Sequence, residues 1–211
     1  NQGESTTIRT GGILIPERIQ KRFRLPPTVT GNAGTLTINT PSLQIETQAL
    51  VTVRHDSLGN AGKIEVDADT LILDGEGKIT ATTASGAGGN INLNLKSDLI
   101  LRNNSLIDTE ALGTGNGGNI TINSPVIAGF ENSDIIANAI QGNGGNIDIT
   151  TQGIFGLKFR NELTTESDIT ASSEFGINGT VKINNFNLDS NLGLVELPVE
   201  VSDSSQQIAS G

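Results

Sequence analysis

The chain has 211 residues, a formal net charge of −10, and no cysteine, methionine, tryptophan or tyrosine. The absence of cysteine excludes disulfide bonds and thiolate metal sites, and the acidic balance argues against nucleic acid as a partner. No apolar run is long enough to cross a membrane, and the polar stretch that opens at Asn1 has no secretion signal, so we expect a fragment or processed product of a longer protein.

Residues 1–30 differ from the rest of the chain in charge and in their prolines. They hold five cations against two acids, whereas residues 31–211 hold 8 cations and 21 acids. We expect a degenerate first coil or a loop-rich segment here, with short strands at Thr7–Arg9 and Ile13–Ile15. The basic segment Arg18–Arg24 is expected to be a solvated loop or a short helix, and the alternative is a docking patch for an acidic partner.

A short phrase recurs six times between residues 31 and 184. Its fullest form is Gly-Asn-Gly-Gly-Asn-Ile-Thr-Ile-Asn at residues 115–123, and its last glycine falls at 34, 62, 89, 118, 145 and 179. The steps are therefore 27 to 29 residues, with one longer step of 34. A fixed period of this size indicates a stacked repeat, and each phrase is a turn followed by an alternating strand. The repeat predicts an all-β solenoid of six to seven coils.

Two positions of the phrase are aliphatic in every copy, and alternation predicts that both point into a narrow core while the polar residue between them faces outward. We expect each column to form a ladder along the solenoid, with neighbours about 4.8 Å apart. The first column is Leu36, Ile64, Ile91, Ile120, Ile147 and Val181, and the second is Ile38, Val66, Leu93, Ile122, Ile149 and Ile183.

Other parts of each repeat predict two more strands, and hence three short strands per coil. A second aliphatic stretch begins at Leu43, Leu71, Leu99 and Ile154, and a third begins at Val51, Ile79, Ile135 and Ile169. The phrase glycines are expected to permit the sharp turn that restarts each coil. The polar column Asn39, Asp67, Asn94, Asn123, Thr150 and Asn184 is expected to form the bend that ends the first strand, with amides bonded from coil to coil.

The long step of 34 residues places an insertion at Lys158–Thr165. Insertions in solenoids emerge as loops on one face, and this loop is either surface decoration or a recognition loop. After Asn184 the phrase stops, and we expect residues 185–211 to form a C-terminal cap or tail. The predicted organisation is therefore residues 1–30, β-helix repeats over 31–184, and the tail 185–211.

The phrase, together with the tail Gly193–Gly211, resembles the filamentous-haemagglutinin-like exoproteins of two-partner secretion, in particular the cyanobacterial members, over about residues 31–211. This resemblance implies a right-handed parallel β-helix, secretion through an outer-membrane partner, and a role in adhesion or surface structure. It supplies no catalytic residues. The family's N-terminal secretion domain is absent here, and the family tail often continues to a cysteine, whereas this chain stops at Gly211.

Few residues suggest catalysis. The best acidic cluster is Glu65, Asp67, Asp69, Asp74 and Glu76. Alternation places its first members on the outer surface, beside in-register residues that offer no base or cation, so a solvated acidic face is the favoured interpretation over an enzymatic one. The sole histidine, His55, has no partner cysteine or second histidine and is a poor candidate for metal binding or nucleophile activation.

Two ligand motifs were also weighed. Gly144–Asp148 has a faint likeness to the calcium-binding nonapeptide, but it lacks one glycine and recurs at the wrong period, so no metal site is predicted. Ice binding would need Thr-x-Thr repeated in register, and Thr80, Thr82 and Thr83 are not expected to recur in this way. We therefore predict no catalytic, cofactor-binding or metal-binding residues and no cofactor.

Two hypotheses for the function follow. The first is a non-enzymatic, secreted or cell-surface solenoid that acts as an adhesin or builds a filament, with end-to-end self-association and with surface glycans or other cells as partners. The second is a carbohydrate-binding or polysaccharide-processing β-helix, whose cleft would be built from loops near Arg54–Asn60 or Lys158–Thr165. The lack of tryptophan and tyrosine, on which sugar rings stack, argues against the second hypothesis.

Overall fold

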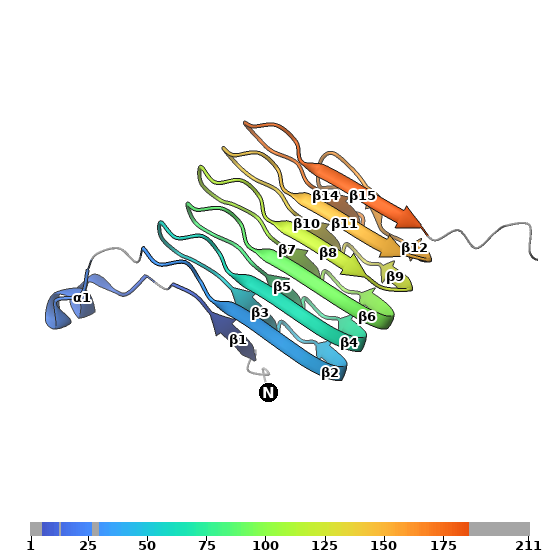
Figure 1. The fold of residues 1–211 in the computed structure, drawn as a ribbon, viewed down its shortest axis with the longest axis horizontal. Helices are drawn as coiled ribbons and strands as arrows, with labels where there is room; N and C mark the ends of the chain where they lie inside the picture. Colours follow the sequence, from blue (N-terminus) through green and yellow to red (C-terminus); the bar gives the residue numbers. More distant parts are fainter. Residues whose placement is uncertain (1–5, 13, 27–29, 186–211) are drawn as a thin grey trace, which may run out of the picture.

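The computed structural model describes residues 6–12, 14–26 and 30–185, and it shows a β-solenoid of stacked coils with parallel sheets (Figure 1). The solenoid makes about four full turns. The expected number of six to seven coils is therefore too high, although strands from all six copies of the phrase take part. The fold class predicted from the repeat is confirmed.

One sheet contains the phrase strands, which lie in front in Figure 1 and pair in the order β2-β4-β6-β8-β11-β15. We call it the long sheet. Its strands are β2 (Thr35–Ile45), β4 (Lys63–Leu73), β6 (Asn90–Leu101), β8 (Asn119–Asn123), β9 (Val126–Gly129), β11 (Asn146–Thr151), β12 (Gly153–Phe155) and β15 (Thr180–Asn185).

The second sheet, which we call the short sheet, lies behind the first and closes each coil (Figure 1). Its order is β1-β3-β5-β7-β10-β14-β13, and all of its pairings are parallel. Its strands are β1 (Thr7–Thr10), β3 (Leu50–Val53), β5 (Lys78–Thr80), β7 (Leu106–Asp108), β10 (Asp134–Ile136), β14 (Asp168–Thr170) and β13 (Lys158–Phe159).

The register of the predicted columns is confirmed for every copy, and their burial is confirmed except at Ile183 in the last strand, which is 39% exposed. Leu36 pairs with Ile64, and the register continues through each following copy to Val181. The column residues of β4, β6, β8 and β11 are at most 1% exposed, whereas those of β2 are only half-buried. The core is therefore most completely buried in the middle of the stack, where each aliphatic side chain has a similar neighbour on both sides.

The prediction of three separate strands per coil is correct only for part of the stack. In β4 and β6 the first and second aliphatic stretches belong to one continuous strand, with a register irregularity between Ala68 and Thr70. Ala68 and Leu95 are buried at this point, so the chain bends without leaving the ladder. In later coils the same two stretches are separate, as β8 and β9 and as β11 and β12.

The asparagine column has no left-handed backbone angle within the described residues. Among the described residues, positive φ angles outside glycine occur instead at Arg24 and at the corner between the two sheets: Thr47, Gln48, Glu76, Asn103, Asn104, Glu131 and Asn132. The coil-to-coil amide bonds are present, since Asn94 donates to Asp67 at 3.0 Å and Asn123 donates to Asn94 at 3.0 Å. The column thus stabilises the stacking, and in β8 it also ends the first strand, as predicted.

The phrase glycines also serve a different purpose from the one predicted. Within the described residues only Gly11, Gly75 and Gly156 have positive φ, and none of these belongs to a phrase. A Cβ atom at Gly118 would instead lie 1.8 Å from the carbonyl oxygen of Gly89 in the preceding coil, and one at Gly145 would lie 1.9 Å from that of Gly118. The column is glycine because the coils approach too closely for any side chain.

The N-terminal residues agree with the expectations in part. The strand predicted at Thr7–Arg9 is β1, which pairs with β3. No strand forms at Leu14 or Ile15, and Ile13 lies outside the described residues. The basic segment forms the helix α1 (Glu17–Phe23), which has no buried residue and projects away from the stacked coils (Figure 1). A surface ion pair between Lys21 and Glu17, 2.6 Å apart, spans one helical turn.

The insertion lies between β12 and β14, where the long step predicted it. The residue just before it, Leu157, is 6% exposed and lies in the core. Its side chain fills the space over Gly129, which follows Ile45, Leu73 and Leu101 in one column of the stack and has no side chain of its own. The chain then forms β13, which pairs with the outer edge of β14. The insertion thereby extends the short sheet by one strand. The predicted tail falls on residues 186–211, outside the described residues.

Candidate functional site

The acidic cluster of β4 faces outward, and the in-register neighbours of Glu65 and Asp67 offer no cation, as predicted, but two lysines at other positions pair with the cluster. Lys63 lies 2.5 Å from Glu65, and Lys96 lies 2.8 Å from Asp69. The hydrogen bond from Lys63 is the main cause that lowers the pKa of Glu65, and the bond to Asp69 raises the pKa of Lys96. These lysines were missed because one lies two residues along the same strand and the other comes from the next coil. The cluster is a set of exposed ion pairs, which contribute little stability.

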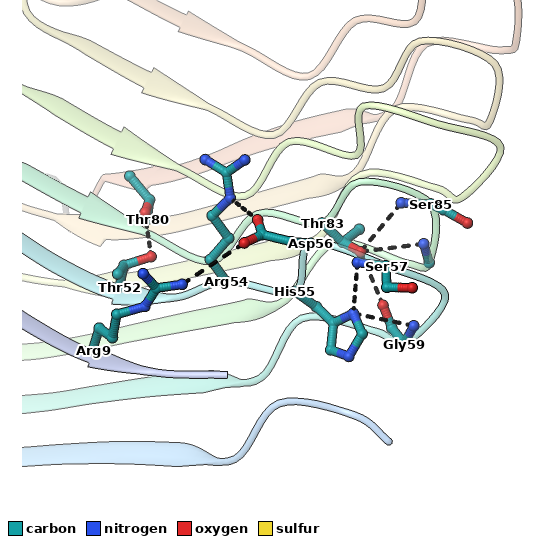
Figure 2. A network of polar contacts seen from close by, with 11 residues as sticks. Arg9, Thr52, Arg54, His55, Asp56, Ser57, Gly59, Thr80, Thr83 and Ser85 are labelled. Carbon is teal, nitrogen blue, oxygen red and sulfur yellow. Dashed lines mark hydrogen bonds and ion pairs between the residues drawn. The ribbon is translucent and has the colours of Figure 1, made fainter. Parts of the chain in front are cut away.

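His55 is a structural residue at a corner of the solenoid. Its side chain is fully buried, and its Nδ1 accepts the backbone N–H groups of Ser57 and Gly59, both at 3.2 Å (Figure 2). Its Nε2 has no hydrogen-bond partner within the described residues. Thr83 and Ser173 occupy the same column in later coils and accept N–H groups of the corresponding turn. His55 therefore closes a turn, as the hydroxyl residues do elsewhere in the column.

The loop near Arg54–Asn60 is held by one ion pair within the loop and by another to the N-terminal segment. Arg54 makes an ion pair with Asp56, and Arg9 from the first coil lies 3.8 Å from the same carboxylate (Figure 2). These contacts join the N-terminal segment to the second coil. Of the two loops proposed for a cleft, the insertion lines one together with the short-sheet side, and the Arg54–Asn60 loop contributes Asn60 to another.

The insertion loop is fastened to the short sheet by Asp168, whose side chain has no exposed surface. One carboxylate oxygen of Asp168 is paired with Arg160, which also contacts Glu166, and the other accepts the N–H of Thr164 at 2.6 Å and its hydroxyl at 2.9 Å. The backbone N–H of Asp168 donates to Asp134 at 2.8 Å. This network was not predicted from the sequence, because its members come from two coils and from the insertion.

We expect Asp168→Asn to lower the free energy of unfolding by about 2 kcal/mol, because it replaces charge-assisted hydrogen bonds at a buried site. Burial raises the pKa of Asp168, but the bonds from Thr164 and Arg160 outweigh burial and lower it overall. The stabilisation is therefore present above the unfolded value of 3.8 and is lost as the pH falls through the lower folded pKa. Urea unfolding at pH 7 and in strong acid measures this, and an equal loss at both pH values would contradict the assignment.

A groove of about 470 Å³, which we call the loop groove, lies between the insertion and the outer face of the short sheet. It is lined by Glu110 and Asn138 from the sheet side, by Asn161 and Glu162 from the insertion, and by Glu174 from the next turn. Burial raises the pKa of Glu110 above its ordinary value. A carboxyl group with a raised pKa, facing a groove that holds other carboxylates, is the kind of group that serves as a general acid.

Asp108 lies two residues before Glu110 and is only 7% exposed. One of its carboxylate oxygens accepts the N–H of Glu110 at 2.7 Å. Burial, with a smaller contribution from the charge of Glu110, raises the pKa of Asp108 to about 7, although the bond from Glu110 and the charge of Lys78 act in the opposite direction. Sequence reasoning missed this residue, whose register position is occupied by Thr52 and Thr80 in the two preceding coils. The signal available in the sequence was an aspartate at a position where the two preceding coils have threonine.

The two ligand motifs gain no support. Asp148 is exposed and accepts the side-chain amide of Asn184 at 3.1 Å, and across the described residues no three His, Cys, Asp or Glu side chains lie close enough to hold a metal ion. The expectation that threonines would not recur is wrong for one pair, since Thr80 donates to the in-register Thr52 at 2.8 Å. The recurrence ends at the next coil, where Asp108 follows.

The aromatic residues have a distribution that composition alone did not reveal. Each phenylalanine within the described residues is exposed, by 44% to 72%: Phe23, Phe130, Phe155, Phe159 and Phe175. The lining of a small hollow adjoining the loop groove includes Phe159. The scarcity of aromatic residues therefore counts less against a carbohydrate ligand, because the phenylalanines that are present lie on the surface.

No helix in the described part of the chain is long and apolar enough to cross a membrane. Comparison of the chain with family models, with curated proteins and with solved structures gave no match. The repeat and the structure therefore establish the fold, and no matched protein supports the resemblance to exoproteins.

Proposed function

We propose that this chain is a non-enzymatic structural or adhesive β-solenoid of the cell surface or the extracellular space. The observation that carries the proposal is the unbroken register of six phrase copies, in which nearly every regular segment serves the ladders. Such a rod provides length and a fixed spacing of surface groups. The resemblance to filamentous-haemagglutinin-like exoproteins supports the same function, together with export through an outer-membrane partner.

The N-terminal end of the rod supports end-to-end association. Within the described residues β2 pairs on one side only, with β4, so its other edge presents unpaired backbone groups. Beside it lies a hollow of about 570 Å³ whose lining includes the apolar side chains of Ile8, Leu43 and Leu50. Because each copy of the phrase already stacks on another copy, a coil of the same repeat is the partner that this end fits. We propose a second copy of the chain as that partner.

Electron microscopy of native material isolated from its source cells tests the proposal. We expect elongated particles with an axial spacing of about 4.8 Å. Fibres much longer than one chain would make the ends the assembly surface, whereas separate short rods would place the function on the lateral faces and the insertion. Compact particles without the axial spacing would contradict a structural solenoid.

One observation favours a second candidate function, the processing of a polysaccharide in the loop groove. Glu110 there has a raised pKa, and Glu162 and Glu174 supply further carboxylates, as acid-catalysed glycoside cleavage requires. Incubation with a panel of acidic and neutral polysaccharides separates the candidates. Cleavage that disappears in Glu110→Gln would overturn the non-enzymatic proposal, and retention without cleavage would favour an adhesin.

A further inference from the structure

A second groove, which we call the corner groove, runs along one corner of the solenoid. It has a volume of about 590 Å³ and crosses four successive coils. Glycines of the phrase form part of its floor, and their identity is already explained by the close stacking of the coils. Its walls are two rows of asparagines, namely Asn60, Asn116 and Asn143 on one side and Asn90, Asn119 and Asn146 on the other.

In the first row, only the side-chain oxygen of each asparagine makes a hydrogen bond to the next coil. The side-chain oxygen of Asn60 accepts the N–H of Ala87 at 2.9 Å, and that of Asn116 accepts the N–H of Asn143, also at 2.9 Å. The oxygen of Asn143 accepts the N–H of Ile177 at 3.1 Å. None of the three Nδ2 groups donates to a protein atom of the described residues, and all three side chains belong to exposed residues. Stacking alone therefore does not use these donors.

The second row is a continuous amide ladder. Asn119 donates to Asn90 and Asn146 donates to Asn119, each at 2.9 Å, and the hydroxyl of Thr180 donates to Asn146 at 2.6 Å. Each amide in this ladder keeps a second N–H hydrogen. The corner groove thus offers neutral donors and acceptors that repeat at the coil spacing of about 4.8 Å, and its lining contains no charged residue.

The spacing of the amide groups and the uncharged lining of the corner groove together indicate which class of ligand it can bind. An extended peptide presents side chains on one face every 6.6 to 6.8 Å or so and would fall out of step with the coils. Nucleic acid and other polyanions are disfavoured by the net charge of −10. Consecutive rings of an extended, β-1,4-linked glycan advance by nearly the coil spacing, with alternate rings turned over, and the hydroxyl groups on both edges of the ribbon accept and donate hydrogen bonds.

We infer that the corner groove binds a linear, uncharged polysaccharide laid along the solenoid axis, with about one sugar ring per coil. This inference rests on the proposed adhesive function and names the ligand class for it. The groove is distinct from the loop groove, so binding here requires neither Glu110 nor Asp108.

The test compares two variants of equal charge. In Asn60→Asp/Asn143→Asp the oxygen that accepts the backbone N–H is kept while the free donor is lost, and the two charges lie three coils apart, beyond the Debye length of about 8 Å at physiological salt. The control, Asn104→Asp/Gln152→Glu, places two charges on exposed residues outside the groove. Circular dichroism and thermal unfolding confirm that both variants fold.

The probes are cellohexaose and hexa-N-acetylchitohexaose, with their shorter oligomers and polygalacturonate for comparison. We expect calorimetry to show that the wild type binds a neutral hexamer better than a dimer and better than polygalacturonate. The groove variant should lose at least about tenfold in affinity, and the control less than about twofold. Ala87→Asn, which fills the gap in the first row, should raise affinity.

Three results would overturn the inference: no binding of either neutral hexamer at millimolar concentration, affinity that does not depend on chain length, or equal losses in the groove variant and the control. The rods or fibres seen by electron microscopy do not depend on these donors. Unchanged particles without glycan binding would therefore reject the ligand and leave the structural function intact.

Discussion

Replacing Gly118 by alanine is expected to lower the free energy of unfolding by at least about 3 kcal/mol, although the change adds a single methyl group. The backbone angle at Gly118 is not the obstacle, since its φ is not in the left-handed region. The obstacle is the preceding coil: the new Cβ would lie 1.8 Å from the carbonyl oxygen of Gly89 and 2.8 Å from the Cβ of Thr109. Relief requires two coils to move apart, which breaks ladder hydrogen bonds on both sides.

Gly31→Ala is the matched control, because a Cβ at Gly31, the first residue of the first phrase, would meet no atom within 4 Å. We expect this variant to unfold within about 0.5 kcal/mol of the wild type. Urea unfolding followed by circular dichroism compares the two midpoints. If Gly31→Ala and Gly118→Ala lose equal stability, close approach between coils is not the cause and the stacking explanation is wrong, because lower flexibility of the unfolded chain would raise the stability of both variants.

Periodicity predicted the parts of this fold that every coil shares. The inward columns through Ile64 and Ile91, and the third stretch at Val51 and Ile79, follow from alternation within a copy and from the repeat between copies. The third stretch had no predicted member in the fourth coil, and the structure places Ile107 there, in register between Ile79 and Ile135. Local pattern and stacking agree at these positions, so the sequence specifies them strongly.

The features that sequence did not reveal depend on contacts between coils that differ from one another. The pairing of Lys96 with Asp69, the turn closed by His55, and the fastening of the insertion by Asp168 each join residues with no shared position in the phrase. The same holds for the loop groove, whose walls come from a repeat position and from the insertion. A repeat predicts what its copies have in common, whereas candidate sites arise where one copy departs from the others.

Asp108→Asn is expected to stabilise the protein strongly at pH 8 and to leave its stability almost unchanged at pH 3. Burial raises the folded pKa of Asp108 to about 7, above the ordinary value of 3.8. Between these two values the folded state keeps a proton that the unfolded state has released, so the free energy of unfolding decreases as the pH rises. A difference of roughly three pKa units corresponds to about 4 kcal/mol, all of it present above pH 7. Asparagine carries no charge and retains an oxygen for the N–H of Glu110, so it removes this penalty.

Unfolding in urea from pH 3 to pH 9 measures the effect, and Asp148→Asn is the control because that carboxylate is exposed on the outer face of β11. The control should follow the wild-type curve, while the curves of Asp108→Asn and the wild type should separate between about pH 4 and pH 7. Parallel curves for all three proteins would show that Asp108 is not held protonated. A confirmed separation would mean that the chain keeps a destabilising carboxyl two residues before Glu110, in a column where threonine also fits. Retention of a destabilising group beside a groove is typical of a functional site, and the polysaccharide panel with Glu110→Gln would then be the decisive comparison.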